Sequence, residues 1–154
     1  MNIIAWRIVQ RRFVKSAFTG EGARRFGGRW NSPGRVAVYT AASQALAALE
    51  MLVHLETQQL LQEYVAIPVA IPEKFIHRVR LFDLPRNWNA YPATDATRAL
   101  GDEWIARAAS PALQVPSTVI PSEHNFLLNP AHGHFRKLRI GKARRFRFDP
   151  RLAL

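Results

Sequence analysis

Residues 43–62 form the longest stretch of the sequence with the apolar spacing of a helix. Its apolar residues recur at helical intervals and would share one face, as in Leu46, Leu49, Val53 and Leu60. Ser43 precedes them and is a suitable N-cap, because its hydroxyl can accept from a free backbone N–H. We therefore expect one helix over 43–62.

Most other apolar segments have the length of strands, and the segment 76–82 also alternates as a strand does. They are 3–9, 36–40, 64–71, 76–82 and 113–120, followed by a strand pair, FRKLRI and RRFRFD, with a turn at Gly141–Lys142. A second helix is expected from Thr97 to Ala109, after a loop over 83–97. Because helices are few, strands are many and the two do not alternate regularly, the sequence predicts an α+β fold.

Length and composition limit the class of protein. The 154 residues suggest one domain, 1–154. The absence of cysteine excludes disulfides and thiolate sites. No apolar run approaches the roughly 20 residues that span a bilayer, and the start MNIIAWRIVQRR is unlike a signal peptide. We therefore expect a cytoplasmic protein that does not contact a membrane.

The net charge of +11 is large for a chain of this size. Its basic residues gather in two groups, one between Arg7 and Arg29 and one between Arg136 and Arg151. Such a charge implies an anionic partner, which can be nucleic acid, a phosphorylated small molecule or an acidic protein. A solvated basic surface is the plainer alternative, but it leaves the grouping unexplained.

The segment GGRWN, from Gly27 to Asn31, combines two glycines with an arginine. Glycine lets backbone N–H groups approach a phosphate closely, and arginine binds phosphate through two N–H groups. The segment is neither a P-loop nor the GxGxxG dinucleotide motif. A plain turn with an exposed arginine is the alternative, and the local chemistry alone favours that alternative.

Glu50 lies in the predicted helix at the margin of an apolar face that centres near Leu49. At about 100° per residue, Leu46 and Val53 lie close beside it. A carboxylate at the edge of a core often borders a cleft. The alternative is a glutamate on the helix flank paired with a lysine or arginine, and the two are equally supported.

Signatures of several other functions are missing. His132 and His134 lack the ligand spacing of a zinc site, so we predict no metal. Ser117 lies in VPST without the GxSxG of a serine hydrolase. The C-terminal strands interleave arginine with phenylalanine, as platforms for single-stranded nucleic acid do. Strand alternation that turns the phenylalanines to the core is the better account.

Six motifs occur in order along the chain: GGRWN, YTA, ALAALE, LGDEW, VPSTVIPSEHNFLLNP and FDPRL. Together they resemble the RES family, the toxin components of bacterial type II toxin–antitoxin systems. The resemblance extends from about Trp6 to Leu152. Each motif alone is weak, but six in this order are specific.

The resemblance implies the residues of an active site. The catalytic positions would be Arg29 in GGRWN, Tyr39 in VYTA, Glu50 in ALAALE and Ser117 in VPST. The substrate-binding positions would be Gly28, Trp30, Asn31 and Asn125. Asn129 also matches a family position, without a defined role.

The resemblance also implies a small domain similar to ADP-ribosyltransferases, with few helices and an NAD cleft between curved sheets. NAD would be the substrate. Arg29 would bind a phosphate or ribose, Tyr39 would stack on nicotinamide, and Glu50 would stabilise positive charge on the reacting ribose. Ser117 would hydrogen-bond the ribose or hold Glu50 in place.

A partner is implied as well, namely an Xre-like antitoxin in a heteromeric complex, and we expect no direct contact with nucleic acid. The acceptor of the reaction stays open. Water would make the protein an NAD glycohydrolase, phosphate an NAD phosphorylase, and a protein side chain an ADP-ribosyltransferase. Two alternatives from other classes are a basic nucleic-acid-binding module and a pure interaction protein.

Overall fold

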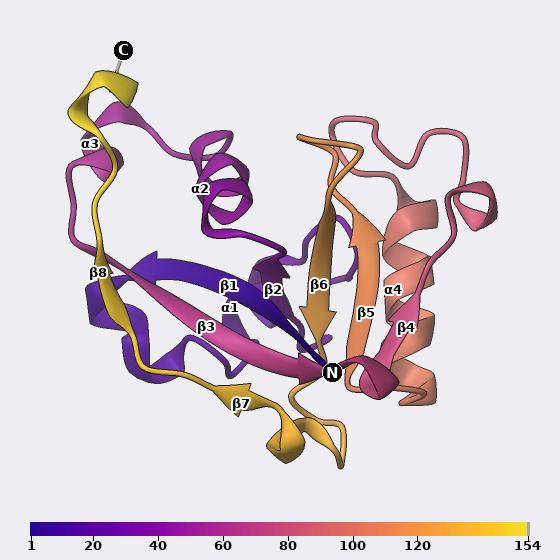
Figure 1. The fold of residues 1–154 in the computed structure, drawn as a ribbon. Helices are drawn as coiled ribbons and strands as arrows, with labels where there is room; N and C mark the ends of the chain where they lie inside the picture. Colours follow the sequence, from indigo (N-terminus) through magenta and orange to yellow (C-terminus); the bar gives the residue numbers. More distant parts are fainter. Residues whose placement is uncertain (154) are drawn as a thin grey trace.

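The computed structural model describes residues 1–153 and shows one curled sheet with few helices (Figure 1). The strands follow the order β4-β5-β6-β2-β1-β3-β7, and β8 also pairs with β3. Their bounds are β1 Asn2–Gln10, β2 Val38–Ala41, β3 Tyr64–Pro72, β4 Ile76–Arg78, β5 Ala112–Pro116, β6 His124–Leu128, β7 Arg139–Ile140 and β8 Arg144–Phe146. The predicted α+β class is confirmed.

The α-helices are α1 Glu21–Phe26, α2 Gln44–Leu52, α3 Thr57–Leu60 and α4 Asp95–Arg107. Short 3-10 segments cover Arg11–Ser16, Glu73–Phe75, Leu81–Asp83, Phe135–Lys137 and Pro150–Leu152. Among residues 1–153, no helix combines the length and the apolar character needed to cross a membrane.

The sheet consists of two arms that meet at a narrow junction. In the first arm, β1 and β3 pair along their whole length, from Asn2 opposite Pro72 to Gln10 opposite Tyr64. In the second arm, β2, β6 and β5 pair in register. Only Trp6 and Ala41 pair where β1 meets β2, so the sheet can bend there. Figure 1 shows the two arms at a steep angle to each other.

Each arm carries one of the two longer helices. Leu46 and Ala47 of α2 pack on the first arm, in a buried cluster with Tyr64. Trp104 of α4 packs on the second arm against Leu113, and Figure 1 shows α4 beside β5. The bend therefore lies between two separately packed layers.

The predicted helix over 43–62 is wrong in its length. Ser43 is the N-cap, with its hydroxyl accepting from Leu46 N, as expected. The helix ends at Leu52, however, and α3 starts again at Thr57. Glu56 and Gln59 form a capping box, which satisfies backbone N–H groups locally and starts a new helix. Glu50 therefore lies in the last turn of α2.

The other predictions differ in their success. The strands over 3–9, 64–71 and 113–120 correspond to β1, β3 and β5. The strand over 76–82 ends early, at Arg78. β6 was missed because its apolar run, Phe126 to Leu128, is only three residues long. The segments β7 and β8 do not pair with each other as a hairpin, since both pair with β3.

Pro68 lies in β3, between the segments that pair with β7 and with β8. Its carbonyl accepts from Gly141 N at 2.7 Å. Because the N–H and carbonyl of one strand residue point the same way, the N–H that proline lacks would point into the gap between β7 and β8. Proline is tolerated there because no strand needs that donor.

Gly101, the glycine of the LGDEW motif, lies directly against the backbone of the GGRWN segment. A Cβ on Gly101 would lie 1.6 Å from the carbonyl oxygen of Trp30, so α4 touches the backbone of the GGRWN segment. In the next position, Asp102 Oδ1 accepts from Ser32 N at 2.8 Å. Helix α4 therefore fixes the segment that carries Arg29.

We predict that Gly101→Ala lowers the free energy of unfolding by at least about 2 kcal/mol, because a methyl group there forces helix and loop apart. Urea unfolding followed by circular dichroism measures this change. Gly22→Ala is the matched control, since Gly22 also lies in a helix and a Cβ there meets nothing within 4 Å. Equal stability of the two variants would contradict the close contact.

Candidate active site

A cleft of about 1400 Å³ opens at the junction between the two sheet arms. Its walls come from β1, β2, the end of α2, the turn after β5, helix α1 and the loop before α4. The lining includes most of the residues singled out from the sequence: Gly28, Arg29, Trp30, Tyr39, Glu50 and Asn125. The fold thus brings together positions that are up to about a hundred residues apart in the chain.

Glu50 is the carboxylate of this cleft. Its Oε1 accepts from Ser117 Oγ at 2.6 Å and from Asn125 Nδ2 at 2.7 Å. Both donors bind the same oxygen, which fixes the orientation of the carboxylate. The buried face of α2 centres on Leu46 and Ala47, while Leu49 is exposed. The expected face was therefore misplaced, and Glu50, four residues after Leu46 and three after Ala47, lies in line with the buried face near the end of the helix.

Ser117 supports the carboxylate from behind. It is fully buried, and its Oγ also accepts from the backbone N–H groups of Val119 and Ile120. These contacts fix both the turn after β5 and the direction of the donated hydrogen bond. Of its two expected roles, the geometry favours holding Glu50, because the hydroxyl has no exposed surface.

Tyr39 and Asn31 organise the GGRWN segment. Tyr39 Oη donates to Asn31 Oδ1 at 2.6 Å and accepts from Trp30 N at 3.1 Å. Burial raises the pKa of Tyr39, which keeps its hydroxyl protonated as a donor. A Cβ on Gly28 would lie 2.5 Å from Tyr39 Oη, so glycine is needed there. Stacking of the Tyr39 ring on nicotinamide stays a prediction.

Asn31 and Trp30 lie inside the wall of the cleft. Asn31 is fully buried, and its Nδ2 donates to the carbonyls of Ala23, Ser32 and Arg35. The Trp30 side chain is buried against α4. The polar groups of the Asn31 side chain are bonded within the protein, which gives this residue a supporting role. Contacts of Asn31 and Trp30 with a substrate stay a prediction.

Arg29 holds the loop before α4. Its Nη1 donates to the carbonyls of Trp88 at 3.0 Å and Ala90 at 2.7 Å. Burial lowers the pKa of Arg29, while the charge of Glu50 acts in the opposite direction. The guanidinium therefore lies within electrostatic range of the carboxylate and remains a cation.

Arg7 is a site residue that the sequence analysis did not single out. It lines the cleft from β1, and its Nη1 donates to Tyr39 O at 3.0 Å. Its Nε is buried without a hydrogen-bond partner, and no carboxylate in residues 1–153 forms an ion pair with it. Desolvation lowers the pKa of Arg7 to about 10. The sequence does contain one indication of Arg7, namely a basic residue inside the apolar strand IIAWRIV.

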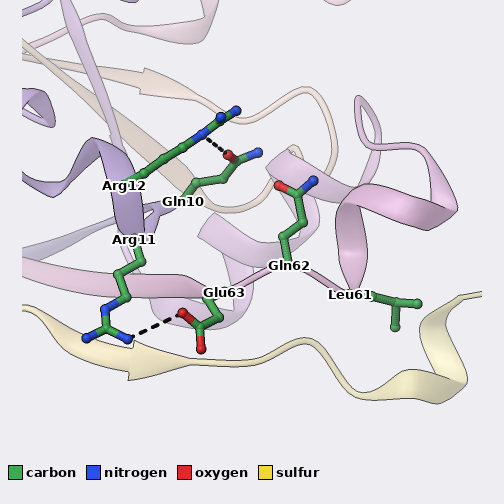
Figure 2. Close-up of a pocket in the computed structure, with 6 residues that line it drawn as sticks. All are labelled: Gln10, Arg11, Arg12, Leu61, Gln62 and Glu63. Atoms are coloured by element: carbon green, nitrogen blue, oxygen red, sulfur yellow. Dashed lines mark hydrogen bonds and ion pairs between the residues drawn. The ribbon is translucent and has the colours of Figure 1, made fainter.

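A second depression, of about 660 Å³, lies near the end of β1 and is lined by Gln10, Arg11, Arg12, Leu61, Gln62 and Glu63. Figure 2 shows Arg11 directed at Glu63 and Arg12 at Gln10. Arg11 and Glu63 form an exposed ion pair, and Arg12 donates to the neutral amide of Gln10. The residues singled out from the sequence line the larger cleft instead, which makes that cleft the candidate active site.

We predict that Arg7→Met does not lower the free energy of unfolding at neutral pH, because it removes a desolvated charge without an acidic partner. The folded state binds the Arg7 proton more weakly than the unfolded state does, so the parent gains stability relative to the variant above pH 10. Urea unfolding at pH 7 and at about pH 10.5 measures this gain, expected to be up to about 1 kcal/mol. A constant difference between parent and variant would contradict it.

Comparison with known proteins identifies the family. Residues 4–149 match the RES domain. The protein called Toxin Res of Yersinia enterocolitica is 42% identical over 151 residues, which cover 97% of this chain and 99% of that protein. The Prs ADP-ribosylating toxin of a Sphingobium species is 34% identical over 157 residues, which cover 99% of this chain and 98% of that protein.

The fold also matches a solved structure, a chain of the M. tuberculosis MbcT–MbcA toxin–antitoxin complex. The TM-score is 0.80 at 17% identity, covering 99% of this chain and 87% of that chain. At that identity the likeness concerns the fold, and it agrees with the sequence relationship above. The chain belongs to the RES domain family.

Proposed function

We propose that this chain is the toxin of a toxin–antitoxin pair and that it cleaves the nicotinamide–ribose bond of NAD in the cytoplasm. The observation that carries the proposal is the Glu50 carboxylate, held at the cleft wall by Ser117 and Asn125. The RES relatives are named as toxins, which supports the proposal that this chain is a toxin.

The geometry suits chemistry that develops positive charge on a sugar. When the bond between the ribose carbon and nicotinamide breaks, its electron pair goes to the nicotinamide nitrogen, which becomes neutral. The carbon becomes oxocarbenium-like, and a preorganised carboxylate such as Glu50 stabilises it. An acceptor oxygen then bonds to that carbon and releases its proton.

The cations of the cleft suit the rest of the substrate. Arg7, Arg29 and Arg98 line the same cleft. Arg7 in particular forms no ion pair with a carboxylate of residues 1–153, and a pyrophosphate would offset the cost of desolvating it. The cleft volume of about 1400 Å³ exceeds the roughly 300–1,000 Å³ of common ligand pockets, which leaves room for a dinucleotide.

Modification of a protein is the second candidate, in which a protein side chain replaces water or phosphate as the acceptor. The Sphingobium relative called an ADP-ribosylating toxin favours this candidate. The same carboxylate serves either reaction, because both begin with cleavage of the bond between nicotinamide and ribose.

A nucleic-acid-binding module is supported less well. Phe148 is buried and stacks edge-to-face with Tyr64 and Phe146, with ring centroids 5.2 and 5.1 Å apart. Arg144, Arg145 and Arg147 point outward. The phenylalanines therefore belong to the core, as strand alternation predicted, and they are not presented for base stacking.

We further propose an acidic antitoxin of the Xre-like kind as the partner. The structural neighbour comes from a toxin–antitoxin complex. The net charge of +11 favours a partner with acidic residues, since complementary charge speeds association and fixes orientation.

The first test is NAD turnover by the purified chain, with and without inorganic phosphate, with products identified by mass spectrometry. Nicotinamide release without phosphate supports hydrolysis, and release only with phosphate supports phosphorolysis. If NAD stays intact in both conditions and no protein acceptor is labelled, the NAD assignment fails.

We predict that Glu50→Gln lowers the rate of NAD cleavage by at least about 100-fold, because the amide keeps the shape but loses the charge. The same variant should not arrest growth when expressed without antitoxin. Its circular dichroism should match that of the parent. Glu63→Gln is the control, since Glu63 is an exposed carboxylate outside the cleft. A folded Glu50→Gln protein with parental activity would contradict the role of the carboxylate.

A further inference from the structure

The exposed aromatic side chains divide into two pairs. Within residues 1–153, they are Phe13, Phe26, Phe82 and Tyr91. The guanidinium of Arg12 covers Phe13 at 4.7 Å from the ring centroid, and that of Arg80 covers Phe82 at 4.2 Å. Phe26 and Tyr91 have no ring or cation partner in that part of the chain, although they are 82% and 85% exposed.

Both uncovered rings lie on the large cleft. Phe26 ends α1, three residues before Arg29. Tyr91 directly follows Ala90, whose carbonyl accepts from Arg29 at 2.7 Å. Phe26 is therefore close to Arg29 in the chain, and the hydrogen bond from Arg29 holds the residue next to Tyr91. Both residues line the same cleft as Arg29 and Glu50.

The loop that carries Tyr91 is held on both sides by arginine. Arg29 donates to the carbonyls of Trp88 and Ala90 on one side. On the other side, Arg98 Nη1 donates to Ala93 O at 2.9 Å. A ring on a loop held in this way loses little further freedom when it binds, which favours a binding role over random exposure.

We infer that Phe26 and Tyr91 form the subsite for the planar base at the far end of a dinucleotide, with the phosphates between the base and Glu50. This inference rests on the proposed function and deepens it. Aromatic side chains bind any base through its flat face, and a positive groove beside them binds the linking phosphates. Arg29, which lines the same cleft, supplies that charge.

The subsite predicts how substrates are ranked. Nicotinamide mononucleotide contains the bond that breaks but lacks the adenosine half of NAD. The parent protein should therefore have a higher kcat/KM for NAD than for the mononucleotide. Phe26→Ala and Tyr91→Ala should each lower kcat/KM for NAD about tenfold, mainly through KM, since base stacking commonly contributes that much.

The controls separate stacking from general damage. The two alanine variants should change kcat/KM for the mononucleotide less than about twofold, because it does not reach the subsite. Tyr91→Phe should behave like the parent, since stacking needs the ring and not the hydroxyl. Phe82→Ala removes an exposed ring that lies outside the cleft, and it should leave kcat/KM unchanged for both NAD and the mononucleotide.

The outcomes are distinct. The subsite is wrong if the alanine variants leave kcat/KM for NAD unchanged, or if they lower kcat/KM for NAD and for the mononucleotide by the same factor. Phe26 and Tyr91 would then be left free to contact a protein partner. If the parent cleaves neither substrate, the proposed function fails, and binding of ADP-ribose measured by calorimetry still tests the subsite. Parental affinity for ADP-ribose in Phe26→Ala and Tyr91→Ala would then overturn it, and loss of affinity in both would support it.

Discussion

The single residue pair between β1 and β2, Trp6 opposite Ala41, is the constraint on which the rest of the structure depends. A full ladder at this point would make one continuous sheet with covered faces. One pair instead lets the two arms turn against each other and opens a cleft between them. Helix α2 packs on the first arm beside this junction and brings Glu50 to the turn after β5, where Ser117 and Asn125 donate to it.

Buried polar groups hold this cleft in shape. Asn31, Ser117 and the hydroxyl of Tyr39 lie behind its surface, and each has its hydrogen bonds within the protein. Buried polar groups are costly unless they are bonded, so a satisfied set of them specifies one arrangement of loops. The groups left for a ligand are different ones: the carboxylate of Glu50, the desolvated Arg7 and the uncovered rings of Phe26 and Tyr91.

Much of the fold was predictable, since β1, β3 and β5 are runs of apolar residues that have the length of strands. The failures have local or long-range causes. β6 has only three apolar residues in a row, Phe126 to Leu128, and one of its partners, β2, lies far away in the chain. The end of α2 depends on the capping box of Glu56 and Gln59, which competes locally with a continuous helix. The segments β7 and β8 depend on β3, a partner that lies far away in the chain.

The α+β class, the strongly positive charge and the presence of a carboxylate, Glu50, on the apolar side of a helix follow from residue types and their spacing alone. Only the tertiary structure decided what surrounds Glu50 and which polar residues face the cleft. Arg7 and Tyr91 could not be placed from their neighbours in the chain. Arg7 donates to the carbonyl of Tyr39 on the neighbouring strand, and the loop of Tyr91 is held by Arg29, so both positions depend on segments that are distant in the chain.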